Sequence, residues 1–327
     1  MSSNVNSVSS TPSANPPRSR FASESPISLL VNSLQDRLLF AIPKKADSSS
    51  AYPGADIKFN RQHRLDVALV QNHPIALVFL PAADIPRFVA LGSVSLGITG
   101  QDVIAESTHG SQIKEILSLG FGKCALQVQV PVSGAIQTVE QLSGARVATS
   151  FEVLSETYFK EIDERAGSGK KTSVEYVGGS VEAACALGMA EGIVDLVESG
   201  DTMRAAGLHA IATLMKSEAV LITPAQKHES LTPALEALIP LIKSRIAGVI
   251  AAKQYVLVNY NIHEDQLHEA TSITPGRRSA TVSKLESEGW MAVSAMVEKK
   301  KMADTMDKLQ NAGAEDILVL ALDNCRV

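Results

Sequence analysis

A short polar run near residue 200 has the residue types that bind an oxyanion. It is Glu198-Ser199-Gly200-Asp201-Thr202, and its glycine allows a sharp turn between an apolar strand and a helix. Amide N–H groups at such a junction point outward, and the helix dipole favours negative charge there. Ser199 and Thr202 add hydroxyl donors. The run therefore predicts a phosphate loop, and an ordinary turn with a capping threonine is the alternative it leaves open.

Three acids accompany this loop: Asp195, Glu198 and Asp201. Carboxylates beside an anion site are explained if a divalent cation such as Mg²⁺ lies between them and a phosphate. Solvated acids at a turn are the alternative. Asp195 lies inside the strand, where an acid is costly to bury. We therefore expect it to support the site through neighbouring residues, without touching the ligand itself. The metal ligands themselves stay unassigned.

Two more polar groups follow predicted strands. Lys44 and Lys45 come after the apolar run 38–42, and Asp102 follows the strand 95–99 and its glycine bend at Gly100. The carboxyl ends of parallel strands are where α/β folds bind ligands. The alternatives are a solvated lysine loop and, for Asp102, a helix cap, which is the role we expect for it from this motif alone.

Strands and helices alternate from residue 27 to residue 253, which predicts an α/β protein with two doubly wound units and a cleft between them. Residues 27–137 and 220–253 would form the first unit and residues 138–219 the second. A long helix over 235–253 would return the chain to the first unit, with a kink at Pro240. The order after residue 254 is βαββαβ, the split ferredoxin-like motif, which predicts a regulatory or oligomerisation domain over 254–327.

Composition excludes several functional classes. The chain has 327 residues and a net charge of −5, which argues against general nucleic-acid binding. No apolar run approaches the roughly 20 residues that span a bilayer, so no membrane partner is expected. Three widely spaced cysteines fit a reducing, cytoplasmic compartment. Residues 1–26 are rich in Ser and Pro and are predicted to be disordered.

Together the motifs resemble the ATP phosphoribosyltransferase family in its long, histidine-regulated form. Their sequences look most similar to those of fungal members. The resemblance runs from about Leu30 to Val327. It is carried by residues 39–45 (LFAIPKK), 96–100 (LGITG), 121–124 (FGKC), 179–182 (GSVE), 194–203 (VDLVESGDTM), 273–278 (ITPGRR) and 324–327 (NCRV).

The resemblance implies that N1 of the ATP adenine attacks C1 of 5-phosphoribosyl 1-pyrophosphate and that pyrophosphate leaves with the help of Mg²⁺. It implies two periplasmic-binding-protein-like catalytic domains with the site in their cleft. Residues 198–202, including Gly200 and Asp201, would hold the 5-phosphate of the sugar. Lys44 and Lys45 would lie near the pyrophosphate, and Asp102 and Glu182 would line the cleft. This is the first step of histidine biosynthesis.

The resemblance also implies feedback inhibition by histidine bound to the C-terminal domain. The positions that match the family's histidine pocket are Asn261, Arg277, Thr281 and Asp316. Asn261 stands where family members can carry an aspartate. A homo-oligomer is implied as well, active as a dimer and inhibited as a hexamer.

One segment departs from the family pattern. Family members typically continue after the two lysines with Gly-Arg-Leu and a helix, whereas here residues 46–53 (ADSSSAYP) lead directly to Gly54. The departure motivates a second hypothesis from another class, a catalytically impaired histidine-sensing or regulatory paralogue on the same fold.

Overall fold

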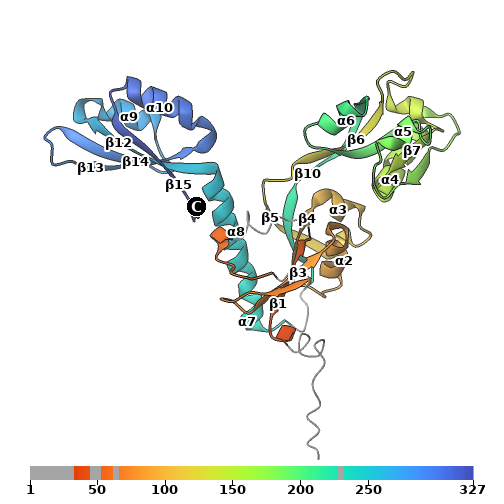
Figure 1. Cartoon of the computed structure of the whole chain (residues 1–327), viewed down its shortest axis with the longest axis horizontal. Helices are drawn as coiled ribbons and strands as arrows, with labels where there is room; N and C mark the ends of the chain where they lie inside the picture. The colour runs from red at the N-terminus through yellow and green to blue at the C-terminus, as the bar shows by residue number, and fades with distance from the viewer. Residues whose placement is uncertain (1–32, 45–52, 62–65, 227–230, 327) are drawn as a thin grey trace, which may run out of the picture. The chain divides into compact units, whose positions relative to one another are not determined.

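A computed structural model describes residues 33–44, 53–61, 66–226 and 231–326 (Figure 1). Three β-sheets of six, five and four strands organise these residues. The predicted disordered segment 1–26, Lys45 and most of the divergent segment 46–53 lie outside the described residues. No helix in the described ranges has the length and apolar content needed to cross a bilayer.

The first sheet has the strand order β2-β3-β1-β4-β11-β5. Its strands are β1 (Leu38–Pro43), β2 (Val67–Leu69), β3 (Ile75–Leu80), β4 (Leu96–Gly100), β5 (Ile113–Ser118) and β11 (Ala219–Pro224). β1 runs parallel to both β3 and β4, and β11 joins β4 in the antiparallel sense. The accompanying helices are α2 (Ile85–Ala90), α3 (Gln101–Glu106), α7 (Pro233–Glu236) and α8 (Leu238–Gln254).

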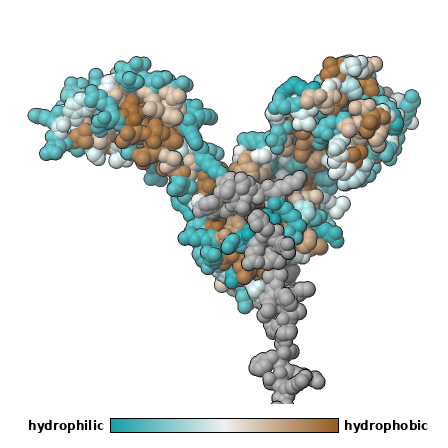
Figure 2. All heavy atoms as spheres, in the orientation of Figure 1, coloured by the Kyte–Doolittle hydropathy of each residue, from teal (hydrophilic) through white to brown (hydrophobic). Residues whose placement is uncertain are grey.

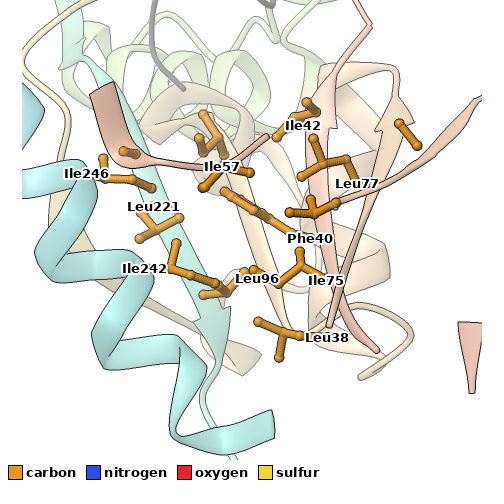
Figure 3. Packing of buried hydrophobic residues seen from close by; sticks show 14 of the residues in the cluster. Leu38, Phe40, Ile42, Ile57, Ile75, Leu77, Leu96, Leu221, Ile242 and Ile246 are labelled. Atoms are coloured by element: carbon orange, nitrogen blue, oxygen red, sulfur yellow. The ribbon is translucent and has the colours of Figure 1, made fainter. Parts of the chain in front are cut away.

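Side chains on both faces of β1 are buried. Phe40 and Ile42 belong to a core that includes Ile242 and Ile246 of α8 (Figure 3). Ala41, between them, belongs to a second core with residues of α2. Successive side chains of a strand point to opposite faces, so a strand buried on both faces is apolar throughout. This explains the uninterrupted LLFAI run in β1.

The second sheet has the order β10-β6-β9-β7-β8. Its strands are β6 (Cys124–Pro131), β7 (Arg146–Thr149), β8 (Ser173–Tyr176), β9 (Gly192–Val197) and β10 (Leu208–Ser217), and its helices are α4 (Glu152–Ala166), α5 (Ala183–Ala186) and α6 (Asp201–Ala205). β10 runs antiparallel to β6 along its whole length, so Ser217 lies opposite Cys124. The second sheet therefore begins at residue 124 and not at residue 138, the boundary predicted from the sequence.

The C-terminal unit contains β12 (Tyr255–His263), α9 (Leu267–Ile273), β13 (Thr281–Lys284), β14 (Trp290–Glu298), α10 (Met302–Asn311) and β15 (Glu315–Ala321), in the predicted order of strands and helices. The sheet order is β13-β14-β12-β15, with every neighbouring pair antiparallel. Trp290, the only tryptophan of the chain, lies opposite His263, with 6.0 Å between the ring centroids.

One face of this C-terminal sheet is covered and the other is open. Val258 and Tyr260 of β12 pack in a core with Leu309 of α10. The opposite face includes Leu318 and Leu320 of β15, which are 59% and 45% exposed. Figure 2 shows hydrophobic residues at the surface of this unit. The open face therefore leaves apolar area uncovered within this chain.

The helix predicted over 235–253 is two helices. α7 ends at Glu236, α8 begins at Leu238, and Pro240 lies in the first turn of α8. The first N–H groups of a helix have no partner within it, so a proline there removes no hydrogen bond. The predicted kink at Pro240 is therefore wrong, and the break comes earlier in the chain.

A substitution at Gly97 of β4 tests how closely α2 packs on the first sheet. An added Cβ would lie 2.7 Å from Ile85 Cγ2 and 2.9 Å from Val89 Cγ2. We expect Gly97→Ala to lower the free energy of unfolding by about 1–3 kcal/mol because the core must shift to admit it. Urea unfolding measures the loss. Gly179→Ala, where no atom lies within 4 Å of the added Cβ, is the control. Equal stabilities for the two variants would contradict the packing.

Candidate functional site

The loop after β9, residues 198–202, turns at a glycine as predicted. Gly200 has a left-handed backbone, φ 79°, and directly precedes α6. Non-glycine residues are disfavoured in this conformation, and an added Cβ would also lie 2.8 Å from Arg204 Nη1. The loop sequence is therefore restricted at this position by its backbone conformation, since the exposed end of the Arg204 side chain can move aside.

An oxyanion already occupies the donors of this loop. Ser199 Oγ donates to Asp201 Oδ2 at 2.6 Å, and Arg204 Nη2 donates to Asp201 Oδ1 at 2.6 Å. The Ser199 hydroxyl and the Arg204 guanidinium together hold the pKa of the Asp201 carboxyl below its usual range. Sequence reasoning did not select Arg204; its position three residues after Asp201, on one face of a helix, was the available signal. Thr202 is exposed, and no side-chain hydrogen bond caps α6.

Asp102 does not cap a helix, contrary to the expectation for its motif. Gly100 precedes α3, and no side chain caps this helix. Asp102 is only 5% exposed; its backbone N–H donates to Ser217 Oγ at 3.0 Å, and the same hydroxyl donates to Asp102 Oδ1. The buried carboxylate thus pairs with the last residue of β10 in the second sheet.

Glu106, at the other end of α3, makes a second connection of this kind. Its Oε1 accepts from Val153 N at 2.8 Å and its Oε2 accepts from Leu154 N at 3.0 Å. These amides lie in the first turn of α4, where N–H groups lack partners within the helix. Two acids of α3 therefore bind backbone or hydroxyl groups of the second unit.

Two carboxylates from different sheets influence the ionisation of Cys124. The pKa of its thiol is raised by burial first and then by Asp102, with a further contribution from Glu198; the hydroxyl of Ser217 acts in the opposite direction. Asp102 follows β4 and Glu198 follows β9, so the ends of strands from two sheets place acids within electrostatic range of one thiol.

Asp195 and Glu182 form the second pair of acids. The pKa of the Asp195 carboxyl is raised by burial and by the nearby charge of Glu182, while the N–H of Leu196, 2.8 Å from Asp195 Oδ1, favours the charged form. Ser180, two residues before Glu182, has φ 52°, a conformation that non-glycine residues rarely adopt. Such backbone strain is often found at functional sites.

Lys44 lies at the carboxyl end of β1, as predicted, beside other charged groups. Its Nζ is 2.8 Å from Asp66 Oδ2, and its carbonyl oxygen accepts from Arg61 Nη1 at 3.5 Å. The Arg61 guanidinium also lies 3.8 Å from the centre of the Phe79 ring. Among the described residues no hydrogen bond or ion pair connects Lys44 with the loop at residues 198–202.

Two of the four positions expected to bind histidine are in contact. Asn261 Nδ2 donates to Asp316 Oδ2 at 2.9 Å, and Asp316 has φ 49°. Thr281 begins β13, and the Arg277 guanidinium lies 6.0 Å from the centre of the Tyr255 ring. Asn261 belongs to the open face of the C-terminal sheet, since Tyr260 and Ile262 beside it point into the core.

The proximity of Asp102 and Glu198 to Cys124 can be tested by alkylating this thiol in a Cys185→Ser, Cys325→Ser background. We expect the pH midpoint for its reaction with iodoacetamide to lie above that of free cysteine. Asp102→Asn should lower the midpoint because it removes a negative charge beside the thiol, and Glu198→Gln should lower it less. Asp201→Asn is the matched control. A midpoint that Asp102→Asn leaves unchanged would contradict the proximity of these groups.

Comparisons with known proteins identify the family of this chain. The family profile HisG, ATP phosphoribosyltransferase, matches residues 81–247, and the profile of the HisG C-terminal domain matches residues 252–324. A chain of the ATP phosphoribosyl transferase (HisG:HisZ) complex from Thermotoga maritima superimposes with a TM-score of 0.53 at 18% identity, over 64% of this chain and 98% of that one. At this identity the likeness shows the fold alone.

Curated relatives extend over nearly the whole chain. The ATP phosphoribosyltransferase of Schizosaccharomyces pombe is 53% identical over 311 residues, and that of Yarrowia lipolytica is 54% identical over 302 residues. The Saccharomyces cerevisiae enzyme is 50% identical over 303 residues. Each alignment covers 91% of this chain and 99% of the relative. The chain belongs to the ATP phosphoribosyltransferase family.

Proposed function

We propose that the loop at residues 198–202 binds the 5-phosphate of 5-phosphoribosyl 1-pyrophosphate. The chain is an ATP phosphoribosyltransferase, the enzyme of the first step of histidine biosynthesis. One observation carries the proposal: the Ser199 hydroxyl and the Arg204 guanidinium already bind an oxyanion, the Asp201 carboxylate. A phosphate would displace this carboxylate. It would accept hydrogen bonds from the same two donors and from the outward N–H groups of the loop.

The reaction needs no nucleophilic side chain. The bond from C1 of the ribose to the pyrophosphate oxygen breaks, the bond from C1 to N1 of adenine forms, and positive charge develops at the sugar. Catalysis then depends on positioning two anionic substrates and neutralising the departing charge. In the proposal Lys44 and Lys45 bind the pyrophosphate, while the pair Asp102 and Glu198 and the pair Asp195 and Glu182 line the site.

Magnesium fits these residues as a cation that arrives with the substrate. In the described ranges no cluster of three or more His, Cys, Asp or Glu side chains is suited to a metal ion. Mg²⁺ is commonly held by one or two carboxylates, water and substrate phosphates, so Asp102 and Glu198 would suffice as protein ligands. When bound, the ion would neutralise charge on the pyrophosphate.

An activity assay with both substrates and Mg²⁺ tests the phosphate loop. We expect Arg204→Gln and Ser199→Ala each to raise KM for the sugar donor about tenfold, because each removes a hydrogen bond to a charged group. Absorbance of the phosphoribosyl-ATP product measures the rate. Arg165→Gln, on the exposed end of α4, is the matched control. A wild-type chain that forms no product would instead favour the histidine-sensing alternative.

For the C-terminal unit we propose a ferredoxin-like regulatory domain that binds histidine through Asn261, Arg277, Thr281 and Asp316. The βαββαβ order and the contact between Asn261 and Asp316 support this assignment. The Asp316 carboxylate would accept hydrogen bonds from the ligand's amino group, and the Arg277 guanidinium would pair with its carboxylate.

Asp316→Asn tests this pocket. We expect the histidine concentration for half-inhibition to rise about tenfold, because a charged partner of the ammonium is lost. Rates measured across a histidine titration, together with calorimetry, give the change. Asp304→Asn on the exposed side of α10 is the control. Equal inhibition of the two variants would remove Asp316 from the pocket.

We also propose that the catalytic units are periplasmic-binding-protein-like domains and that the chain forms homo-oligomers, with a dimer favoured by substrates and a hexamer by histidine. The exposed apolar side chains of β15 support association, because contiguous apolar area on a surface commonly marks an interface. Sedimentation velocity with and without histidine would measure the change in mass. A monomer under both conditions would reject this part of the proposal.

A further inference from the structure

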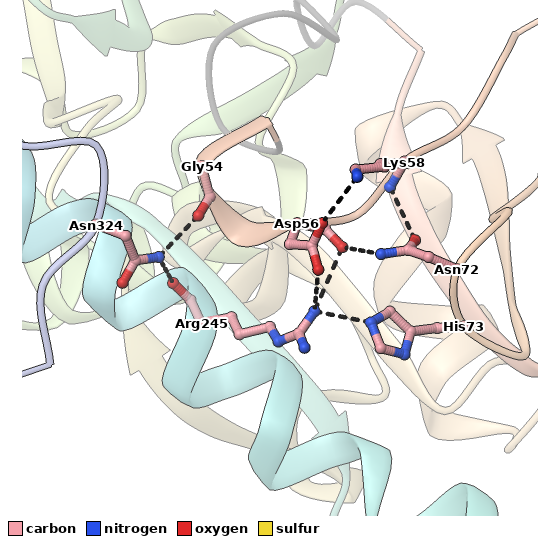
Figure 4. A network of polar contacts seen from close by, with 7 residues as sticks. All are labelled: Gly54, Asp56, Lys58, Asn72, His73, Arg245 and Asn324. Atoms are coloured by element: carbon pink, nitrogen blue, oxygen red, sulfur yellow. Dashed lines mark hydrogen bonds and ion pairs between the residues drawn. The ribbon is translucent and has the colours of Figure 1, made fainter.

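A short segment after β15, residues 323–326, binds α8 and the beginning of the described chain after residue 52. We call this segment the strap (Figure 4). Asn324 Nδ2 donates to the carbonyl oxygens of Gly54 at 2.7 Å and Arg245 at 3.3 Å. The strap is held further by Cys325 N, which donates to Gly248 O at 3.1 Å. Arg326 Nη1 donates to Ser244 Oγ at 2.6 Å.

Two glycines make room for the strap. A Cβ on Gly54 would lie 2.8 Å from the carbonyl oxygen of Asp323, and a Cβ on Gly248 would meet the side chain of Asn324 and lie 3.0 Å from the carbonyl oxygen of Cys325. Gly248 is inside α8, where glycine costs stability relative to alanine. Its presence there is explained by the close approach of the strap.

The strap touches a segment, residues 54–58, that is held by a polar network (Figure 4). Arg245 Nη1 lies 3.3 Å from both the carbonyl oxygen and Oδ2 of Asp56, and 2.7 Å from His73 Nε2. Asn72 Nδ2 donates to the same carbonyl at 2.7 Å. Asp56 has φ 55°, a conformation that persists where surrounding contacts hold it. Arg245 thus contacts the strap through its carbonyl and Asp56 through its side chain.

The same segment leads to the substrate end of β1. Ala55 and Ile57 are buried in the core of the first sheet, and Phe59 bridges to Val70. Two residues later the Arg61 guanidinium donates to the carbonyl oxygen of Lys44. A continuous run of described residues, 54–61, therefore joins Asn324 at one end to Lys44 at the other.

We propose that Asn324 is a positioning residue for phosphoribosyl transfer: by binding Gly54, it fixes the segment whose Arg61 orients the end of β1 that carries Lys44. The inference rests on the proposed role of Lys44 in binding the pyrophosphate. It also connects the C-terminal unit to the substrate site through contacts of the strap, independently of any histidine contact.

Two variants displace the strap by different means. Asn324→Asp keeps the size of the side chain but removes both donated hydrogen bonds and puts a carboxylate against two carbonyl oxygens. Gly248→Ala adds a Cβ where Asn324 lies, while alanine favours the helix itself. The matched control is Asn311→Asp, the same chemical change at an exposed position at the end of α10.

Steady-state kinetics with the full chain separate a positioning role from a general loss of stability. We expect both variants to raise KM for the sugar donor about fivefold while kcat changes less than about twofold, because Lys44 remains available to the departing pyrophosphate and only its placement before the reaction is loosened. Hydrogen exchange of residues 54–58 should be faster in both variants and unchanged in Asn311→Asp.

The remaining outcomes overturn the inference. A KM unchanged in both variants, or kcat falling together with the melting temperature while KM stays constant, would leave Asn324 only a structural role. If KM rises without faster exchange in residues 54–58, the proposed route through this segment is wrong. A wild-type chain without activity would reject the proposed function, whereas wild-type activity with normal Asn324→Asp kinetics rejects only the role of the strap.

Discussion

The buried pairing of Asp102 with Ser217 is the constraint on which the candidate site depends. A carboxylate that is almost fully buried is costly unless polar partners satisfy it, so the end of β4 and the end of β10 must stay together. β10 in turn pairs with β6 from Ser217 to Leu208, which places Cys124 beside the same acid, and β9 pairs with β6 on its other side. One contact between two sheets thereby brings both Asp102 and Glu198 within electrostatic range of Cys124. Glu106, by binding the first turn of α4, holds the other end of α3 to the second unit.

The parts of this protein that could be predicted from the sequence are those that depend on the pattern of neighbouring residues. Apolar runs identified β1, β3 and β9, and the glycine turn before α6 followed from its residue types alone. The strands and helices of the C-terminal unit appeared in their observed order because alternation within β12 and helical spacing within α10 are properties of neighbouring residues. The loop at residues 198–202, which we propose binds phosphate, was predicted from the same kind of local information.

What sequence reasoning missed depends on contacts between distant residues. β6 belongs to the second sheet because β10 returns about 85 residues later to pair with it, as in the contact of Gln127 with Thr213, and no local pattern reveals this. Asp102 was expected to cap α3, but its partner Ser217 lies 115 residues away. Arg204 was overlooked because its role depends on the turn at Gly200 that brings it back to Ser199. The predicted kink at Pro240 failed for a different reason: a proline in the first turn of a helix breaks nothing.

The single tryptophan gives this chain an optical signal confined to one unit. Trp290 lies edge-on against His263 in the C-terminal sheet, and His263 Nδ1 is 3.1 Å from Asp265 Oδ2. Because the chain has no other tryptophan, indole fluorescence follows the state of this sheet and does not respond directly to the two sheets that carry the carboxylates and the lysine. Far-ultraviolet circular dichroism, by contrast, averages over all three sheets. Recording both signals during denaturation therefore distinguishes melting of the C-terminal unit from melting of the rest without any added label.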